Sequence, residues 1–126
     1  MSKYTSILEN FHKSEFQCKC GCGLGFDQMD RKLLNRLDIA REFAGVPFTI
    51  NSSIRCGKHN ENVGGRINSA HLTGNAVDIK ADSSGDRFKI IEALLCAGFN
   101  RIGVYDTFIH VDNDQSKPQK VLWVDV

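Results

Sequence analysis

The chain has 126 residues, which suits one domain, residues 1–126, that buries a hydrophobic core of its own. Its composition, 41% hydrophobic and 25% charged, is that of an ordinary globular protein. The formal net charge is +1, with Lys and Arg scattered among acidic residues, so we expect neither a nucleic-acid partner nor insertion into a membrane.

The N-terminal segment, residues 1–10, lacks the continuous apolar stretch of a secretory signal. No later segment approaches the length needed to span a bilayer. We therefore expect the chain to be made in the cytoplasm without a signal peptide.

The five cysteines cannot all pair, and Cys18, Cys20 and Cys22 are separated by single residues instead of the two-residue gaps of zinc knuckles. This pattern favours free thiols in a reducing compartment. A second metal held by these three residues is the alternative, because thiolates bind zinc well once they are brought together. Cys56 and Cys96 are interpreted as ordinary packed thiols.

The first regular element expected is a helix over residues 30–44. Gly45 and Pro47 follow it, and both residue types commonly mark the end of a helix. Its apolar residues recur at gaps of four, three and four, and they are Leu33, Leu37, Ala40 and Ala44.

Residues 47–52 alternate well enough for a strand, which would place Arg55 just beyond its C-terminal end. The glycine-rich stretch that follows is interpreted as an irregular loop, and its glycines are Gly57, Gly64 and Gly65. Residues 76–79 alternate again and predict a second short strand.

Residues 84–97 form the second expected helix, because a serine caps its start and Gly98 follows its end. Its apolar face should cover one side of a sheet and consists of Phe88, Ile91, Leu94 and Leu95. Short strands are then expected at 101–104, 108–112 and 121–124, with the first two joined as a hairpin. The expected fold is a small α+β domain with a mainly antiparallel sheet flanked by helices.

His71, Asp78 and His110 are the residues that indicate chemistry. Two imidazoles and one carboxylate can hold a zinc ion, and three protein ligands leave a fourth tetrahedral position for water, as in hydrolytic zinc sites. Gly74 allows a sharp turn after His71, and the strand at 76–79 would carry Asp78 back beneath it. The pattern therefore indicates a zinc hydrolase.

These residues are also part of a longer resemblance. The motifs are Ser52-Ser53-Ile54-Arg55, Asn60, Gly64-Gly65, Ser69-x-His71, Gly74-x-Ala76-x-Asp78-Ile79, Ile102-Gly103-x-Tyr105 and His110-Val111-Asp112. From Phe11 to Trp123 the chain resembles the zinc D-Ala-D-Ala carboxypeptidase and L-alanyl-D-glutamate endopeptidase group, which cuts peptidoglycan stem peptides. The resemblance implies a zinc peptidase with that group's Hedgehog-like fold and its zinc site on the sheet.

The partner that the resemblance implies is a peptidoglycan stem peptide. Cleavage of the L-Ala-D-Glu bond is favoured, because a lysin has to break the mesh, and D-Ala-D-Ala carboxypeptidase activity is the alternative. Peptidoglycan lies outside the membrane, so a chain without a signal peptide needs another route to it. A phage or prophage endolysin released through a holin lesion has such a route, and we expect it to act as a monomer.

Arg55 and Ser69 are the expected substrate-binding residues. A guanidinium can clamp a carboxylate with two parallel hydrogen bonds, and the substrates implied by the resemblance carry free carboxylates close to the bond that is cut. Ser69, two residues before His71, is expected to hydrogen-bond the substrate backbone.

The general base has several candidates. In many relatives it is an acidic residue three positions before the second histidine, but that position here is Thr107. Asp106 precedes it in the expected hairpin turn, and Asp112 shares a strand face with His110 because side chains alternate along a strand. Either carboxylate could instead orient a metal-binding imidazole, and His59 is a third candidate.

Two alternatives have a different chemistry. Cys56 and His59 have the residue types of a cysteine nucleophile and its base, although no third group that would orient them is recognisable. The same zinc-bearing fold also occurs in Hedgehog-type signalling domains, so a non-catalytic, zinc-stabilised module that binds cell-wall peptides could carry the same ligands.

Overall fold

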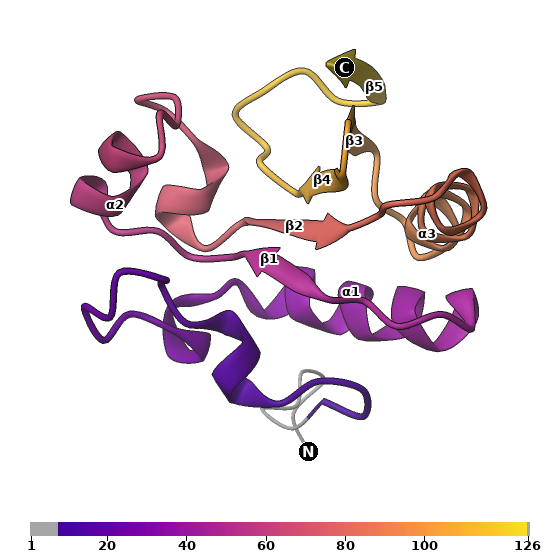
Figure 1. Cartoon of the computed structure of the whole chain (residues 1–126), viewed down its shortest axis with the longest axis horizontal. Helices are drawn as coiled ribbons and strands as arrows, with labels where there is room; N and C mark the ends of the chain where they lie inside the picture. The colour runs from indigo at the N-terminus through magenta and orange to yellow at the C-terminus, as the bar shows by residue number, and fades with distance from the viewer. Residues whose placement is uncertain (1–7, 126) are drawn as a thin grey trace.

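The computed structural model describes residues 8–125, which form a five-stranded sheet packed against helices (Figure 1). The helices are α1 (Arg31–Ala44), α2 (Gly57–Asn62) and α3 (Ser84–Cys96), with 3₁₀ turns η1 (Lys13–Phe16), η2 (Phe26–Gln28) and η3 (Ala70–Thr73). The strands are β1 (Ile50–Ser52), β2 (Ala76–Lys80), β3 (Arg101–Tyr105), β4 (Phe108–Asp112) and β5 (Val121–Asp125).

The prediction that the chain has no secretory signal concerned residues 1–10, and residues 1–7 of this segment lie outside the described residues. Among residues 8–125, no helix combines the length and the apolar character needed to cross a membrane.

The predicted helix over 30–44 is confirmed as α1. The Asp30 carboxylate caps its start by accepting the backbone N–H of Leu33 at 3.0 Å, and Gly45 ends it in the left-handed region with φ 69°. The apolar face predicted from the spacing is buried, including Leu33, Leu37 and Ala40.

The second predicted helix is confirmed as α3, but its apolar face was predicted correctly only in part: Leu94 is buried and Ile91 is partly buried against the core. Phe88 and Leu95 are 67% and 52% exposed. The buried residues of α3 are Ile90, Ala93 and Leu94. Apolar residues surround most of this helix, so its packing against α1 and β4, not its own periodicity, selects the face that is buried.

The glycine-rich stretch interpreted as an irregular loop contains the short helix α2. The helix begins at Gly57, and the Cys56 sulfur caps it by accepting the backbone N–H of His59 at 3.3 Å. Its six residues, Gly57–Asn62, are mostly polar and carry no apolar repeat, so hydrophobic periodicity gives no signal for it.

The sheet has the strand order β1-β2-β4-β3-β5 and is mixed, so the prediction of a mainly antiparallel sheet was wrong. The hairpin between β3 and β4 is confirmed, and β1, β2 and β4 also pair antiparallel. β5 is parallel to β3, because the loop 113–120 passes the N-terminal end of β3 and starts β5 next to Asn100, whose carbonyl accepts the Val121 N–H at 2.9 Å.

The two faces of the sheet have different compositions, as the alternation along β4 predicted. One face carries core residues packed with the helices, including Val77, Ile79, Ile102, Ile109 and Val111. On the other face, the register aligns one residue from each strand in a row, namely Ser52, Asp78, His110, Gly103 and Trp123. The polar row therefore lies on the side of the sheet that faces away from the core.

Candidate metal centre

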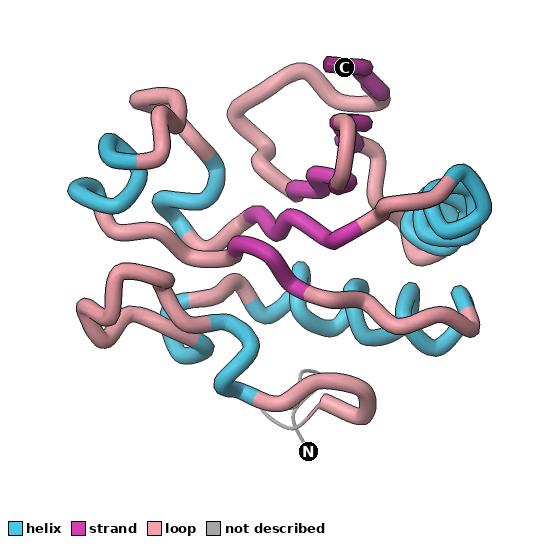
Figure 2. The backbone as a smooth tube through the Cα atoms, viewed as in Figure 1, coloured by secondary structure: helices cyan, strands magenta, loops and turns pink. Residues whose placement is uncertain are grey.

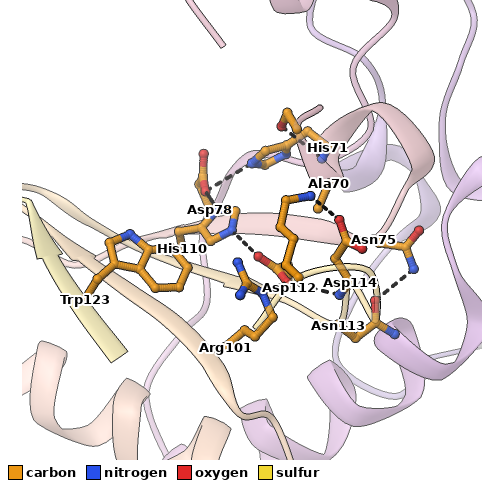
Figure 3. A network of polar contacts seen from close by, with 12 residues as sticks. Ala70, His71, Asn75, Asp78, Arg101, His110, Asp112, Asn113, Asp114 and Trp123 are labelled. Carbon is orange, nitrogen blue, oxygen red and sulfur yellow. Dashed lines mark hydrogen bonds and ion pairs between the residues drawn. The ribbon is translucent and has the colours of Figure 1, made fainter. Parts of the chain in front are cut away.

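The structure brings together the three residues that the sequence indicated as metal ligands. One donor atom from each of His71, Asp78 and His110 lies within 4.8 Å of the other two. His110 Nδ1 is 2.9 Å and His71 Nε2 is 3.3 Å from the same oxygen, Oδ1 of Asp78. Figure 3 shows the three side chains pointing toward one another from η3, β2 and β4.

His71 is placed by the short turn η3. Ser69 caps this turn by accepting the His71 N–H at 3.2 Å, and Gly74 closes it with φ 73°. Gly74 is also needed for space, because a Cβ there would lie 2.2 Å from the carbonyl oxygen of Gln28. The turn therefore ends at Gly74, four residues before Asp78, and the chain enters β2 at Ala76.

Each imidazole has a partner that fixes which nitrogen carries its proton. His71 Nδ1 lies 2.7 Å from the carbonyl oxygen of Ser53, so it donates there and leaves the lone pair of Nε2 directed at Asp78. His110 Nε2 lies 2.8 Å from Oδ2 of Asp112, which leaves Nδ1 directed at Asp78. Such partners orient metal-binding histidines in many sites.

Two imidazole nitrogens and a carboxylate oxygen thus converge, and either a proton or a metal cation can bridge them. Ligand atoms about 2.0–2.1 Å from a tetrahedral zinc ion lie about 3.3 Å apart, close to the 2.9 and 3.3 Å distances in the structure. The donor set and its spacing fit a metal ion. The structure confirms the convergence, while the assignment of roles to these residues stays a prediction.

The contacts between the histidines and the carboxylates shift the pKa values of both His110 and Asp78. Burial opposes the charged form of His110, but hydrogen bonds to Asp112 and Asp78 outweigh it and raise its pKa to about 9. Burial likewise raises the pKa of Asp78, yet its contacts with His110 and His71 outweigh burial and hold the pKa of Asp78 well below the usual range. A metal held here by His71, Asp78 and His110 would replace the proton that the carboxylates hold on His110.

Asp112 lies on the far side of His110 from Asp78 and is almost fully buried (Figure 3). Its Oδ1 accepts the Nε–H of Arg101 at 2.6 Å and the backbone N–H of Asp114 at 3.0 Å. Although burial acts in the opposite direction, the hydrogen bonds from His110 and Arg101 lower the pKa of Asp112. These contacts make Asp112 well suited to orient His110 and poorly suited to accept another proton.

Trp123 and Arg101 lie next to His110 and Asp112 in the site, and the sequence analysis gave neither of them a role. The indole lies over Gly103, where a Cβ would be 2.6 Å from the ring, and its Nε1–H donates to the Tyr105 hydroxyl at 3.2 Å. The Arg101 guanidinium lies 5.2 Å from the indole centre. A glycine inside a predicted strand was the available signal, since it often marks a close approach by another group.

Arg55 lies beside the ligands with its guanidinium held on three sides. It donates to Ser52 Oγ at 3.0 Å, to Asn60 Oδ1 at 3.2 Å and to Oδ2 of Asp78 at 3.4 Å. Gly65 leaves room for this arrangement, because a Cβ there would be 2.0 Å from Asn60 Oδ1. A guanidinium has five N–H donors, so these three bonds leave two for another acceptor.

A cavity of about 650 Å³ opens in front of the ligands. Arg55, Ser69 and Asp112 line it together with all three presumed metal ligands. Asp106 is exposed in the turn between β3 and β4, and it is not part of the lining.

His59 lies outside the cavity lining, in α2, and contacts Cys56 through its backbone N–H. The choice of general base therefore stays a prediction.

The family model described as Peptidase M15 matches residues 9–112, which include all three presumed ligands. No curated protein matches the chain.

Proposed function

The chain belongs to the peptidase M15 family, and on that premise we propose that it is a zinc-dependent peptidase that hydrolyses peptidoglycan stem peptides. The family indicates a metallopeptidase. The observation that carries the proposal is the convergence of two imidazoles and a carboxylate at the wall of a cavity that also holds Arg55.

His71, Asp78 and His110 would hold the zinc ion. When bound, zinc polarises a peptide carbonyl and lowers the pKa of a water molecule to about 7. The residues around the ligands maintain the geometry: the Ser53 carbonyl fixes the ring of His71, and Asp112, held by Arg101, fixes that of His110.

The lining of the cavity suits an anionic peptide. Arg55, Arg66 and Lys117 contribute cationic side chains, and Phe108 and Trp123 contribute apolar surface. The free N–H groups of Arg55 can donate to a carboxylate next to the scissile bond, and the Ser69 hydroxyl can donate to the peptide backbone. The volume of about 650 Å³ lies within the usual range of roughly 300–1,000 Å³ for ligand sites.

Within this proposal we favour cleavage of the L-Ala-D-Glu bond over removal of a terminal D-Ala. We also propose that the protein acts as a monomeric phage or prophage endolysin that reaches the cell wall after release. Asp112 is assigned the positioning of His110, because its two carboxylate oxygens are engaged by His110, Arg101 and the Asp114 backbone N–H. Asp106 and His59 then remain the candidates for the base, and both lie outside the cavity lining.

The proposal is tested by incubating the purified protein with purified peptidoglycan and following the release of new amino groups. Mass spectrometry of the products identifies the bond, because new N-terminal D-Glu and released D-Ala come from different cleavages. A chelator should abolish the release and added zinc should restore it. Absence of new amines in the presence of zinc would refute the peptidase.

A non-catalytic module that binds cell-wall peptides is the second candidate, and one observation favours it. In the part of the chain that the structure describes, the acidic side chains lining the cavity are Asp78 and Asp112, and both are engaged by histidines. Zinc-dependent retention of the protein on peptidoglycan without any new amino group would support this candidate.

A further inference from the structure

Four cysteines meet at a second place in the molecule, away from the His71 site. Cys18, Cys20 and Cys22 lie in the segment between η1 and η2, and Cys56 lies at the start of α2. Their sulfur atoms all lie within 4.8 Å of one another. The two segments are distant in sequence but lie on the same side of the molecule (Figure 1, left).

The arrangement corrects two expectations from the sequence. Cys56, interpreted as an ordinary packed thiol, belongs to the cluster, whereas Cys96 is exposed on α3 and outside it. Cys20 and Cys22 are also exposed, so only Cys18 is a buried thiol. All five cysteines lie within the described residues, and none of them forms a disulfide there.

The separations of the sulfur atoms suit a shared metal ion. Cys18 Sγ is 3.4 Å from Cys20 Sγ, which is 3.6 Å from Cys56 Sγ. A disulfide requires about 2.05 Å. Four sulfurs bound at about 2.3 Å to a tetrahedral zinc ion lie about 3.8 Å apart. We propose that Cys18, Cys20, Cys22 and Cys56 bind a second, structural zinc ion.

The backbone conformation of the segment between η1 and η2 brings its three cysteines together. Gly21 lies between Cys20 and Cys22, and Gly23 follows Cys22. Their φ angles are 80° and 99°, in a region that other residues rarely adopt. The segment closes on itself, because the Cys18 N–H donates to the carbonyl of Leu24 at 2.9 Å. Glycine turns thus gather three sulfurs despite the one-residue gaps that separate them.

Backbone N–H groups are directed at the sulfurs, as expected around thiolates. The Cys56 N–H donates to Cys18 Sγ at 3.5 Å, and the His59 N–H donates to Cys56 Sγ at 3.3 Å. Hydrogen bonds to ionised acceptors are stronger than those to neutral ones, so they favour the charged form that binds metal.

The proposed ion would have a structural role. Four thiolates complete a tetrahedral shell and leave no position for substrate or water. The segment between η1 and η2 contains little regular structure (Figure 2), so a metal cross-link would replace the backbone hydrogen bonds it lacks. Cys56 directly follows Arg55, whose own N–H donates to the His71 carbonyl at 3.0 Å, so the cross-link would also anchor the chain beside the catalytic cavity.

The inference is independent of the proposed peptidase activity, and counting zinc ions per chain tests it. Elemental analysis of protein purified under reducing conditions, without chelator, should find two zinc ions per chain. His71→Ala/His110→Ala and Cys20→Ser/Cys22→Ser should each retain one. Cys96→Ser is the matched control and should retain two, because this thiol lies outside the cluster. A histidine variant that holds no zinc would overturn the proposal.

Alkylation provides a measurement that does not depend on cysteine substitutions. In the folded wild-type protein, iodoacetamide should modify Cys96 readily and leave the four clustered thiols protected until a strong zinc chelator removes the metal. Peptide mass spectrometry assigns each site. Alkylation of the exposed Cys20 and Cys22 as fast as Cys96, or a disulfide within the cluster, would contradict a bound metal.

Discussion

The two clusters of metal-binding residues rest on different kinds of support. Asp78 and His110 face each other on paired strands, and hydrogen bonds to Ser53 and Asp112 orient the two imidazoles. The cysteine cluster instead depends on a glycine-rich segment and the first turn of a short helix. A sheet can hold an open site in position for chemistry, whereas a loop cluster needs its metal to fix the loop. Loss of metal should therefore affect activity at the first cluster and stability at the second.

The largest effect expected is on hydrolysis, from removal of a ligand on the sheet. His110→Ala should lower the rate of stem-peptide cleavage on the order of a thousandfold, because metal ions supply several kcal/mol of transition-state stabilisation. The measurement is the rate of amine release together with zinc content. The matched control is His12→Ala, an exposed histidine outside the cavity, which should keep the wild-type rate. Full activity in His110→Ala would show that His110 is not a ligand of the catalytic metal.

The next largest effect is on the thermal stability of the loop cluster. Cys20→Ser/Cys22→Ser should lower the melting temperature by about 10 °C or more, because structural zinc contributes directly to folding free energy. Calorimetry measures it against Cys96→Ser, which should melt like the wild type. Equal melting temperatures for the two variants would mean that the cysteine cluster does not stabilise the fold. The expectation that loss of metal affects stability at this cluster would then be wrong.

The two aspartates near His110 sharpen the comparison within the sheet site. Asp112→Asn should weaken zinc binding about 10–100-fold, as expected for a group that orients a ligand. Asp106→Asn should keep its zinc and lower turnover about a hundredfold, the usual contribution of a general base. Zinc titration and steady-state kinetics of both variants separate the effects. Near-normal turnover of Asp106→Asn with zinc bound would exclude this residue as the base.

The smallest effect on hydrolysis is expected at Arg55. This residue contacts Asp78 of the first cluster and directly precedes Cys56 of the second. Arg55→Lys keeps the charge but cannot reproduce the planar set of donors that contacts Ser52, Asn60 and Asp78. We expect kcat/KM to fall about tenfold, corresponding to the loss of a hydrogen bond to a charged group. A peptide without the adjacent carboxylate should show little difference between Lys and Arg. Equal rates on the carboxylate-bearing peptide would exclude a bidentate clamp.

Elements with local signals were predictable from the sequence. Asp30 and Gly45 set the ends of α1, and alternation set the face of β4 that carries His110. The predictions failed where no local signal exists. The direction of β5 depends on how the loop 113–120 passes β3, and the buried face of α3 depends on which elements pack against it.

The sequence by itself determined the chemical types of the presumed ligands and their order, because His71, Asp78 and His110 stand in recognisable local frames. Only the tertiary structure decided which distant side chains meet. The contacts of Arg101 with Asp112, of Trp123 with Gly103 and of Cys56 with Cys18 join separate segments of the chain. The physical reason is that secondary-structure propensities and helix caps act over a few residues. These contacts depend instead on strand register and packing, which cannot be read from a single sequence.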